Sequence, residues 1–577
     1  MTHPRLLMIL ALCLTMCSAC VGLPDSGDVQ VGDDRPTSSQ DSGFPYDPRP
    51  PQAGEEATEI VGHFLDAMMA NPTTTSVAKQ FLSEEARESW HPDRQLITYD
   101  GILTPTGNEE VSVTVLNAHH LDGRGVWQGT LPADQRTLKF AMTVENGEWR
   151  IEDPPDAMIV SDEFFAARYR QASLYFLDPT ARVVVPEPVF VPRGGQLSAV
   201  LMRSLLLGPG RRLQGVTRSY IPDDLSLDLT APVSADGVAE VSLRGETAPL
   251  DAESAELMSV QIAWTLRQDP SVRRIRLTIN ETPVTVSGTS SDFDVDMGEE
   301  YNPVGDGSWQ GLFALRDGRM VSSVGASATR VSGPFGAHDY DLATFAVDLD
   351  ASRVAGVTGD RSSVVLASVD KDEQPVALDS GRTDLLKPAW DVAGRLWMLD
   401  RTPQGAVIRY WWKGRVREVT VPGVSGKAVS RFLVSRDGTR LVAVVRGARR
   451  DVVVQSRLAL IGSRLRGTRA EVIHVDDGEK VRIADIAWFS PTAVALVRPI
   501  TDELSQVTTF SVDGSRFVQP LEVPIELVRD DIVALVSSPA ENLVTWAVAA
   551  SGEPHDLSAE SDPTPPGEGL KELTYVG

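Results

Sequence analysis

The pattern of apolar and polar positions begins with a short, almost entirely apolar run. Arg5 precedes apolar residues over positions 6–16, and small residues follow over positions 18–19. A positive charge, an apolar core and small residues in this order are typical of a secretory signal peptide. The run is shorter than the roughly 20 residues that a membrane-spanning helix needs, and it lacks the polar face of a helix packed on a core. We therefore expect residues 1–19 to be a signal peptide.

The apolar pattern disappears in the next segment. Residues 21–52 are rich in Pro, Asp, Ser, Gly and Gln. Such a composition does not bury enough apolar surface to offset the entropy of folding. A flexible chain of about 30 residues has an average reach of roughly 30 Å. We expect this segment to be an extended tether between the N-terminus and the folded part of the chain.

Helical and then alternating patterns follow the tether. Apolar residues recur at helical spacing over positions 57–68, and a second stripe covers positions 77–90. Between positions 111 and 151 apolar residues alternate with polar ones, which is typical of half-buried strands. Asn146 and Gly147 predict a tight hairpin turn within this region. Two helices followed by antiparallel strands predict a small α+β domain, by analogy with cystatin or NTF2-like folds.

The chain then alternates between strands and helices, which predicts an α/β module. The expected elements are a helix over 162–176, strands over 183–185 and 189–191, a helix over 197–207, a strand over 238–243, a helix over 251–266 and a strand over 272–280.

A weak internal repeat begins near residue 305. Each of six copies consists of an apolar strand, a polar turn and a second apolar strand. Five equivalent positions lie 42, 45, 53 and 49 residues apart, namely Val354, Leu396, Leu441, Val494 and Leu543. Periods of roughly 40–50 residues with several short strands each indicate the blades of a β-propeller. A β-sandwich with coincidental spacing is the alternative.

These patterns divide the chain into consecutive parts. The expected parts are the signal peptide over 1–19, a lipidated tether over 20–54, an N-terminal α+β domain over 55–160, an α/β domain over 161–291, an all-β propeller over 300–550 and a polar C-terminal tail over 551–577.

Composition removes several classes of function. The only cysteines are Cys13, Cys17 and Cys20, so the rest of the chain contains no disulfide, no thiolate metal site and no cysteine nucleophile. The formal net charge is −26. A strongly acidic chain does not suit nucleic acid, whose phosphates attract basic patches. The same charge gives no electrostatic attraction to anionic lipid.

The residues around Cys20 suggest a covalent lipid anchor. Ser18 and Ala19 are small residues directly before Cys20, and this arrangement resembles a bacterial lipobox. In such proteins the cysteine becomes an N-palmitoyl, S-diacylglycerol cysteine and the new N-terminus. Cys17 is the alternative, but the bulky Met16 precedes it. Several acyl chains hold a protein stably at a membrane, which one chain does not.

Motifs for catalysis and for metal binding are missing. The sequence contains no G-x-S-x-G nucleophile elbow and no H-E-x-x-H helix. His119, His120 and Asp122 could suggest a metal site, but Gly123 follows them and a solvated turn is the simpler interpretation. Residues 292–296 imitate a calcium loop whose later positions do not fit. We therefore expect no catalytic residues, no metal and no cofactor.

Several segments resemble known families. Residues 238–243, 261–266 and 272–280 resemble a GerMN domain, an envelope-associated α/β module named for spore-germination proteins. The order of lipobox, tether, α+β domain, GerMN module and propeller resembles the LpqB family of actinobacterial lipoproteins along nearly the whole chain. The strings LYFLDPT at 174–180 and QIAWTL at 261–266 carry this resemblance most specifically.

The resemblance implies a function that spacing and charge do not show. It implies a non-enzymatic lipoprotein at the extracytoplasmic face of the cell membrane, held there by its lipid anchor. It also implies binding to the sensor histidine kinase MtrB, with effects on envelope homeostasis and cell division. The alternatives are a protein that binds or hydrolyses a cell-wall polymer with the propeller face, and a purely structural tether.

Overall fold

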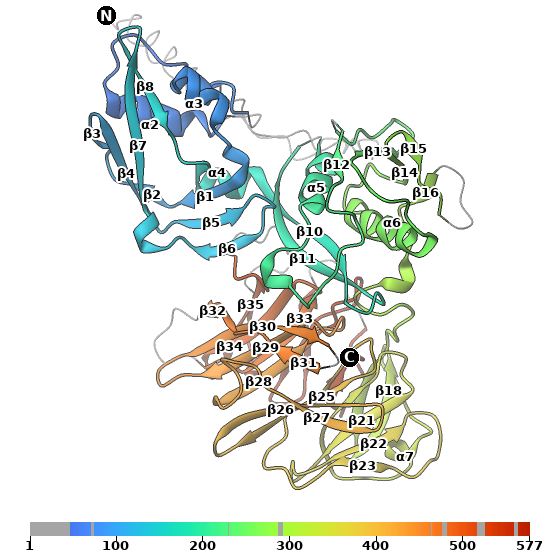
Figure 1. The fold of residues 1–577 in the computed structure, drawn as a ribbon. Helices are drawn as coiled ribbons and strands as arrows, with labels where there is room; N and C mark the ends of the chain where they lie inside the picture. Colours follow the sequence, from blue (N-terminus) through green and yellow to red (C-terminus); the bar gives the residue numbers. More distant parts are fainter. Residues whose placement is uncertain are drawn as a thin grey trace, which may run out of the picture. The chain divides into compact units, whose positions relative to one another are not determined.

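The computed structural model describes residues 47–70, 74–194, 196–228, 230–286, 292–462, 464–475, 482–515, 526–558 and 564–577 (Figure 1). These residues belong to one compact unit. The expected signal peptide, Cys20 and most of the expected tether lie outside them.

The N-terminal domain begins with a helix that has its own N-terminal cap. Helix α2 (Ala57–Ala67) starts with a capping box, in which the side chains of Glu56 and Glu59 accept hydrogen bonds from each other's backbone. The second expected helix is two pieces, η1 (Ala78–Phe81) and α3 (Glu84–Ser89). Ser83 separates them, because its hydroxyl caps α3 by accepting a hydrogen bond from the Ala86 amide.

Two sheets complete this domain, in the orders β6-β5-β1-β9 and β2-β4-β7-β8, with β3 paired to β4. The strands are β1 (Gln95–Tyr99), β2 (Gly101–Ile102), β3 (Thr106–Gly107), β4 (Glu110–Leu116), β5 (His119–Asp122), β6 (Trp127–Thr130), β7 (Thr137–Glu145), β8 (Glu148–Asp153) and β9 (Met158–Ser161). Asn146 and Gly147 both have positive φ, 53° and 84°, so the expected hairpin turn joins β7 to β8.

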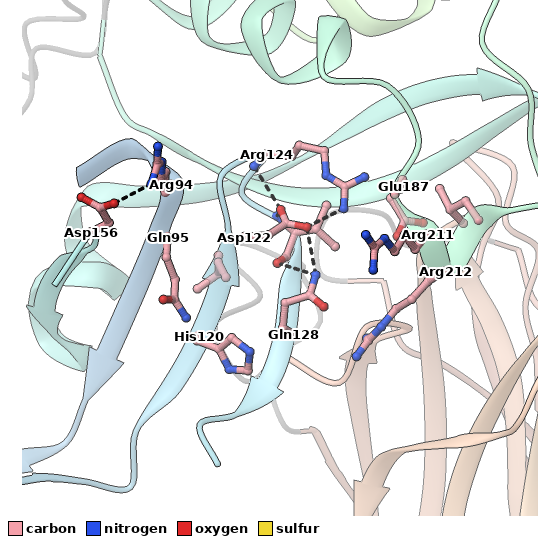
Figure 2. A pocket seen from close by; sticks show the side chains of 14 residues that line it. Arg94, Gln95, His120, Asp122, Arg124, Gln128, Asp156, Glu187, Arg211 and Arg212 are labelled. Atoms are coloured by element: carbon pink, nitrogen blue, oxygen red, sulfur yellow. Dashed lines mark hydrogen bonds and ion pairs between the residues drawn. The ribbon is translucent and has the colours of Figure 1, made fainter. Parts of the chain in front are cut away.

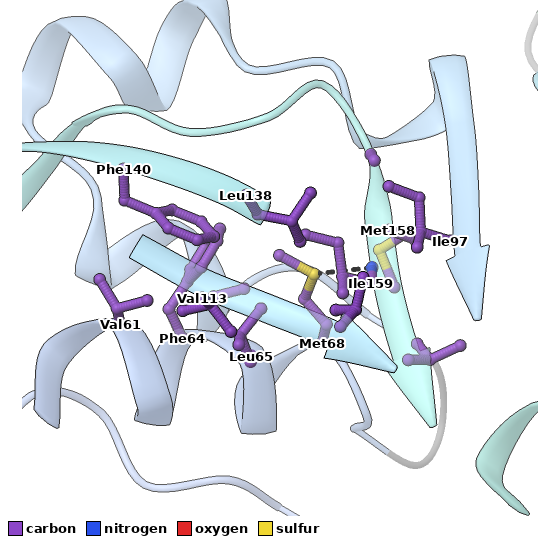
Figure 3. Close-up of a cluster of buried hydrophobic side chains, with 14 of the residues drawn as sticks. Val61, Phe64, Leu65, Met68, Ile97, Val113, Leu138, Phe140, Met158 and Ile159 are labelled. Carbon is purple, nitrogen blue, oxygen red and sulfur yellow. Dashed lines mark hydrogen bonds between the residues drawn. The ribbon is translucent and has the colours of Figure 1, made fainter. Parts of the chain in front are cut away.

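The core of the domain lies between α2 and the sheets (Figure 3). Phe64 on α2 meets Phe140 on β7 edge to face, with ring centroids 6.1 Å apart. The Ile159 amide donates a hydrogen bond to the Met68 sulfur at 3.1 Å. The expected α+β domain is confirmed.

The helix expected over 162–176 is wrong in its second half. Helix α4 (Asp162–Arg168) ends where β10 (Tyr169–Leu177) begins. Strand β10 pairs with β11 (Val184–Pro192) at nine successive positions. Six of its nine residues are buried, among them Leu174, Phe176 and Leu177. The continuous ladder with β11 decides between the two conformations.

The α/β module follows the hairpin of β10 and β11. Its sheet has the order β12-β13-β14-β15, and β16 also pairs with β14. Strands β13 and β14 are parallel and are joined by α6, as expected for a βαβ unit. The elements are α5 (Leu197–Leu206), β12 (Ser226–Leu227), β13 (Val238–Arg244), α6 (Ala252–Leu266), β14 (Arg274–Ile279), β15 (Thr282–Pro283), β16 (Asp292–Asp294) and η5 (Glu299–Tyr301).

Six successive antiparallel sheets among the described residues form the C-terminal propeller. The strands are β17 (Leu312–Arg316), β18 (Arg319–Val324), β19 (Ser327–Arg330), β20 (Leu342–Val347), β21 (Arg353–Thr358), β22 (Val364–Ser368), β23 (Val376–Asp379), β24 (Ala389–Trp390), β25 (Leu396–Thr402), β26 (Gly405–Trp412), β27 (Arg415–Val419), β28 (Val429–Val434), β29 (Arg440–Arg446), β30 (Asp451–Ile461), β31 (Arg464–Gly467), β32 (Glu471–Val475), β33 (Asp485–Ser490), β34 (Ala493–Thr501), β35 (Leu504–Ser511), β36 (Glu526–Val528), β37 (Ile532–Val536), β38 (Trp546–Ala549), β39 (Pro554–Asp556) and β40 (Lys571–Thr574).

The repeat found in the sequence corresponds to the first two strands of each sheet. Val354, Leu396, Leu441 and Val494 lie in the second strands of their sheets, and Leu543 lies shortly before β38. The expected multi-domain architecture with a C-terminal propeller is therefore confirmed.

The last strand of the chain belongs to the first sheet of the propeller. Strand β40 pairs with β17, so the sheet has the order β19-β18-β17-β40. This pairing closes the ring of sheets between the two ends of the propeller sequence. Residues 551–577, which the sequence pattern assigned to a polar tail, thus contain β39 and β40. Leu573, Tyr575 and Val576 are buried there, which explains why this end of the chain is ordered into the sheet.

Candidate functional site

The residue that the sequence marks for modification, Cys20, lies outside the described residues. Within the described ranges, no group of three or more His, Cys, Asp or Glu side chains could hold a metal ion. No helix in the same ranges is long and apolar enough to cross a membrane. Buried polar contacts join the domains among the described residues.

The hairpin of β10 and β11 contributes to the cores of two domains. Phe190 belongs to the core of the N-terminal domain, where its ring lies 5.0 Å from that of Phe165. Its neighbours Val189 and Val191 belong to the core of the α/β module. Because successive side chains of a strand point to opposite faces, one strand fills two cores.

The same hairpin is joined to the propeller by buried charges. Glu187 Oε2 lies 2.5 Å from Arg457 Nη2 and 3.5 Å from Arg440 Nη2. Arg440 also donates a hydrogen bond to the Pro186 carbonyl. The Arg440 side chain is completely buried, and those of Glu187 and Arg457 are about 10% exposed or less. Burial of an ion pair costs desolvation energy, so the contact depends on all its partners being present.

Burial changes the titration of groups around this contact. It lowers the pKa of the Arg440 guanidinium to about 10, which leaves the group charged at neutral pH. It raises the pKa of the Asp513 carboxyl. Gln171 of β10 donates a hydrogen bond to the Ser511 hydroxyl at 2.8 Å, beside Asp513. Polar side chains of the hairpin are therefore matched to polar side chains of the propeller.

The N-terminal domain reaches the hairpin and the module through one turn. The Phe190 amide donates a hydrogen bond to the Gly125 carbonyl at 2.8 Å. Gly125 has a φ of 83°, and a Cβ there would overlap the Phe190 carbonyl. Arg124 in the same turn donates to the Gly208 carbonyl at 3.3 Å. The close approach to the Phe190 backbone therefore requires glycine at position 125, and a Cβ at Gly210 would displace the Arg124 guanidinium.

A pocket of about 620 Å³ lies beside this junction (Figure 2). Its lining comes from the N-terminal domain, from β11 and from the short helix η4 (Arg211–Leu213) of the module. Figure 2 shows Arg94 with Asp156 at one end of the pocket and Arg211 with Arg212 at the other. We call it the arginine pocket, and its charged or polar lining residues are Arg94, Gln95, His120, Asp122, Arg124, Gln128, Asp156, Glu187, Arg211 and Arg212.

The carboxylates that line the arginine pocket are already occupied by donors of the protein. Asp122 accepts hydrogen bonds from the Arg124 and Val126 amides, from the Arg124 guanidinium and from the Gln128 amide group. Asp156 accepts from Arg94 Nη1 at 2.7 Å and from the His91 amide at 2.9 Å. Glu187 is held by the two arginines of the propeller.

The arginines at the other end of the pocket form fewer ion pairs with the protein. Arg211 is exposed and forms no ion pair with a described residue. Arg212 forms one ion pair, 3.2 Å from Glu471, in which both side chains are about half exposed. An exposed pair of this kind contributes only about 0–1 kcal/mol. Desolvation lowers the pKa of His120, and the Arg212 charge acts in the same direction, so His120 is neutral at pH 7.

His119, His120 and Asp122 lie at a strand end before a turn, as the sequence pattern indicated, but they are half-buried and do not form the solvated turn itself. These residues form strand β5, because they pair with β1 and β6, and His120 and Asp122 line the arginine pocket. The sequence analysis did not single out Arg211 and Arg212, which directly follow the turn at residues 208–210. Asp292 in the calcium-like segment instead accepts from Arg276 Nε at 2.9 Å.

Comparisons with known families cover most of the described chain. Residues 50–166 match the model described as "Lipoprotein LpqB, N-terminal domain". Residues 173–285 match the model described as "Sporulation and spore germination", which corresponds to the expected GerMN module. Residues 318–562 match "Lipoprotein LpqB beta-propeller domain".

Relatives that match most of the chain occur in several actinobacteria. The protein from Mycobacterium leprae named "Lipoprotein LpqB" is 26% identical over 565 residues, which are 91% of each chain. Those of Cutibacterium acnes and Thermobifida fusca, with the same name, are 24% and 26% identical and cover 89% and 81% of this chain and 90% and 83% of their own length. The expected resemblance is thereby confirmed, and the chain belongs to the LpqB family of lipoproteins.

Proposed function

We propose that the protein is anchored through lipidated Cys20 at the extracytoplasmic face of the cell membrane, where its folded domains bind and modulate the sensor histidine kinase MtrB. Through the kinase it would influence envelope homeostasis and cell division. The proposal assigns the protein a binding role and no catalysis. Family membership supports the lipoprotein part, and the kinase as partner comes from the resemblance.

The observation that supports a binding role is the hairpin shared by three domains. Strand β11 fills the N-terminal core with Phe190 and the module core with Val189 and Val191. The same strand holds two buried arginines of the propeller through Glu187. A partner that contacts two of these domains would meet surfaces already fixed by shared contacts, so binding would cost little ordering entropy.

Anchoring would make a weak contact sufficient. Two proteins confined to one membrane have a high effective concentration for each other. A flexible tether of about 30 residues would hold the folded domains at an average distance of roughly 30 Å from the anchor, within reach of the extracytoplasmic part of a membrane kinase.

The test compares kinase output in cells that carry different forms of the protein. One form has Cys20→Ala behind a cleavable signal, and the other keeps the anchor but ends before residue 300. We expect both to change phosphorylation of the response regulator relative to the intact chain. The substitution Glu110→Gln at an exposed ion pair serves as the matched control and should leave the output unchanged.

Crosslinking in intact membranes provides the direct measurement, with the kinase expected among the captured partners only when Cys20 is present. If both altered forms support the same output as the intact chain, the kinase proposal is wrong. Binding to purified cell wall would then test the polymer-binding alternative.

A further inference from the structure

We propose that the arginine pocket binds the phosphoryl group of a small phosphorylated molecule, with Arg211 and Arg212 as its principal ligands. This site goes beyond the proposed function and does not depend on the kinase.

The balance of unoccupied groups in the pocket favours an anion. Asp122 accepts four hydrogen bonds from protein donors, and Asp156 and Glu187 each hold arginine side chains. No lining carboxylate is therefore left to attract a cation. Among the described residues, Arg211 has no ion-pair partner and Arg212 has only the exposed Glu471.

The backbone that carries the two arginines is held in place by other residues. Arg124 is fixed by Asp122, and its guanidinium packs on Gly210 and donates to the Gly208 carbonyl. Helix η4 begins directly after Gly210, so this contact positions Arg211 and Arg212 at the pocket. A binding site whose backbone is already held by buried or half-buried contacts loses less conformational entropy on binding a ligand than a flexible site does.

The chemistry of the lining selects phosphoryl groups among anions. A guanidinium group donates two parallel hydrogen bonds to phosphate or carboxylate oxygens. A phosphomonoester carries a charge of about −1.5 to −2 at pH 7, which matches two weakly compensated guanidinium groups better than a single carboxylate does. His120 also lines the pocket.

The size of the pocket indicates more than free phosphate. A volume of about 620 Å³ is within the range of sites for small organic ligands, about 300–1,000 Å³. A phosphorylated glycerol or sugar unit would place its phosphoryl group on Arg211 and Arg212. The remaining volume near Gln95, Gln128 and His120 offers hydrogen-bonding groups for its hydroxyls.

Isothermal titration calorimetry on the full chain in detergent tests the site. The probes are inorganic phosphate, glycerol 3-phosphate and pyrophosphate, and acetate is the carboxylate comparison. We expect glycerol 3-phosphate and pyrophosphate to bind more tightly than acetate, and binding to weaken with added salt. Vesicles with a phosphatidic acid headgroup, compared with vesicles of phosphatidylcholine alone, distinguish a lipid source from a free ligand. If the chain prefers the phosphatidic acid vesicles, and the double substitution Arg211→Gln and Arg212→Gln removes this preference, the ligand of the site is a lipid headgroup.

Three variants locate the binding. The double substitution Arg211→Gln and Arg212→Gln should weaken binding by at least about tenfold, because charge-assisted hydrogen bonds are lost. The matched control, Arg330→Gln with Arg415→Gln, removes two exposed arginines of the propeller and should leave binding within about twofold. Glu471→Gln releases Arg212 from its competing carboxylate and should strengthen binding, by about two- to fivefold.

Two results would overturn the proposal. One is the absence of measurable binding of every phosphoryl probe, with Kd above about 10 mM. The other is equal weakening in the arginine variant and in the matched control, which would indicate a non-specific effect of net charge. Circular dichroism and the thermal midpoint, unchanged in all variants, establish that the fold is intact when the titrations are compared.

Discussion

Glu187 on β11 and Arg457 on β30 form a buried ion pair, with 2.5 Å between Oε2 and Nη2, that joins the α/β module to the propeller. Arg440 lies 3.5 Å from the same carboxylate oxygen. Arg440 Nε and Nη1 and Arg457 Nη1 have no hydrogen-bond partner among the described residues. Glu187 thus compensates both guanidinium groups, and Asp437 Oδ2, 3.6 Å from Arg440 Nη1, is a second buried carboxylate beside Arg440.

The first prediction concerns this carboxylate. Glu187→Gln keeps the shape of the side chain but leaves the buried Arg457 without its ion-pair partner and Arg440 with Asp437 alone. In the first unfolding transition, in which the least stable part of the chain unfolds, the free energy of unfolding should fall by about 3–5 kcal/mol. Urea denaturation measures the change. The control Glu110→Gln breaks an exposed pair with Lys139 and should cost no more than about 1 kcal/mol. Equal effects of the two substitutions would show that Glu187 does not carry the contact.

Parts of the fold whose pattern is local could be predicted from the sequence. The turn at Asn146 and Gly147 follows from two residues that accept positive φ. The parallel pair β13 and β14 with α6 between them follows from a strand, a helix and a strand in succession. The six sheets of the propeller follow from six copies of an apolar strand, a polar turn and an apolar strand. In each case residues close in sequence determine the element.

Features that depend on pairing between strands or between domains were not predicted. Strand β10 was expected to be part of a helix, and its ladder with the next strand, β11, shows that it is not. Strand β40 was assigned to a polar tail, because its partner β17 lies more than 250 residues earlier. The residues that line the arginine pocket lie between Arg94 and Leu213 and come from more than one domain. No single sequence motif could therefore predict the pocket.

The second prediction concerns the residue that links two cores. Phe190 is 3% exposed and contacts Phe165 and Trp127 in the N-terminal core. Phe190→Ala should leave a cavity and lower the free energy of unfolding by about 3–5 kcal/mol. Hydrogen exchange should increase in β5 and β6, which lie on that side of the hairpin. Val144→Ala, at an exposed position of β7, is the control and should change stability by less than about 0.5 kcal/mol. A uniform increase of exchange throughout the chain would contradict the assignment.

The third prediction concerns closure of the propeller. Deletion of residues 571–577 removes β40 and the buried side chains Leu573, Tyr575 and Val576. Each such side chain contributes about 1.5–3 kcal/mol when buried, so the propeller should lose more than about 4 kcal/mol of stability. Limited proteolysis should then cut within residues 312–330. The substitutions Lys571→Gln and Glu572→Gln, both at exposed positions, should leave the proteolysis pattern unchanged. Resistance of the deleted form equal to that of the intact chain would show that β40 does not close the ring.

The fourth prediction concerns alkaline pH. Burial raises the pKa of Tyr169, which stacks on Phe165, to about 12. An unfolded tyrosine titrates near pH 10. Between these values the folded state binds more protons than the unfolded state, so stability should decrease as the pH rises from about 10 to 12. Tyr169→Phe should make this decrease shallower, as measured by urea denaturation across that range. An identical pH dependence in the variant would mean that Tyr169 titrates normally.

The last prediction concerns the choice between two cysteines as the anchor. Ser18 and Ala19 precede Cys20, whereas the bulky Met16 precedes Cys17. Signal cleavage requires small residues before the cut, so Cys20 should be the modified residue. Metabolic labelling with a radioactive or alkyne fatty acid should label the intact chain and the Cys17→Ala variant. It should fail for Cys20→Ala, which should also retain its signal peptide and migrate as the longer precursor. Two acyl chains or more are needed for stable anchoring, so fractionation should find the mature chain with the membranes. Labelling that persists in Cys20→Ala and disappears in Cys17→Ala would move the anchor to Cys17 and lengthen the tether by three residues.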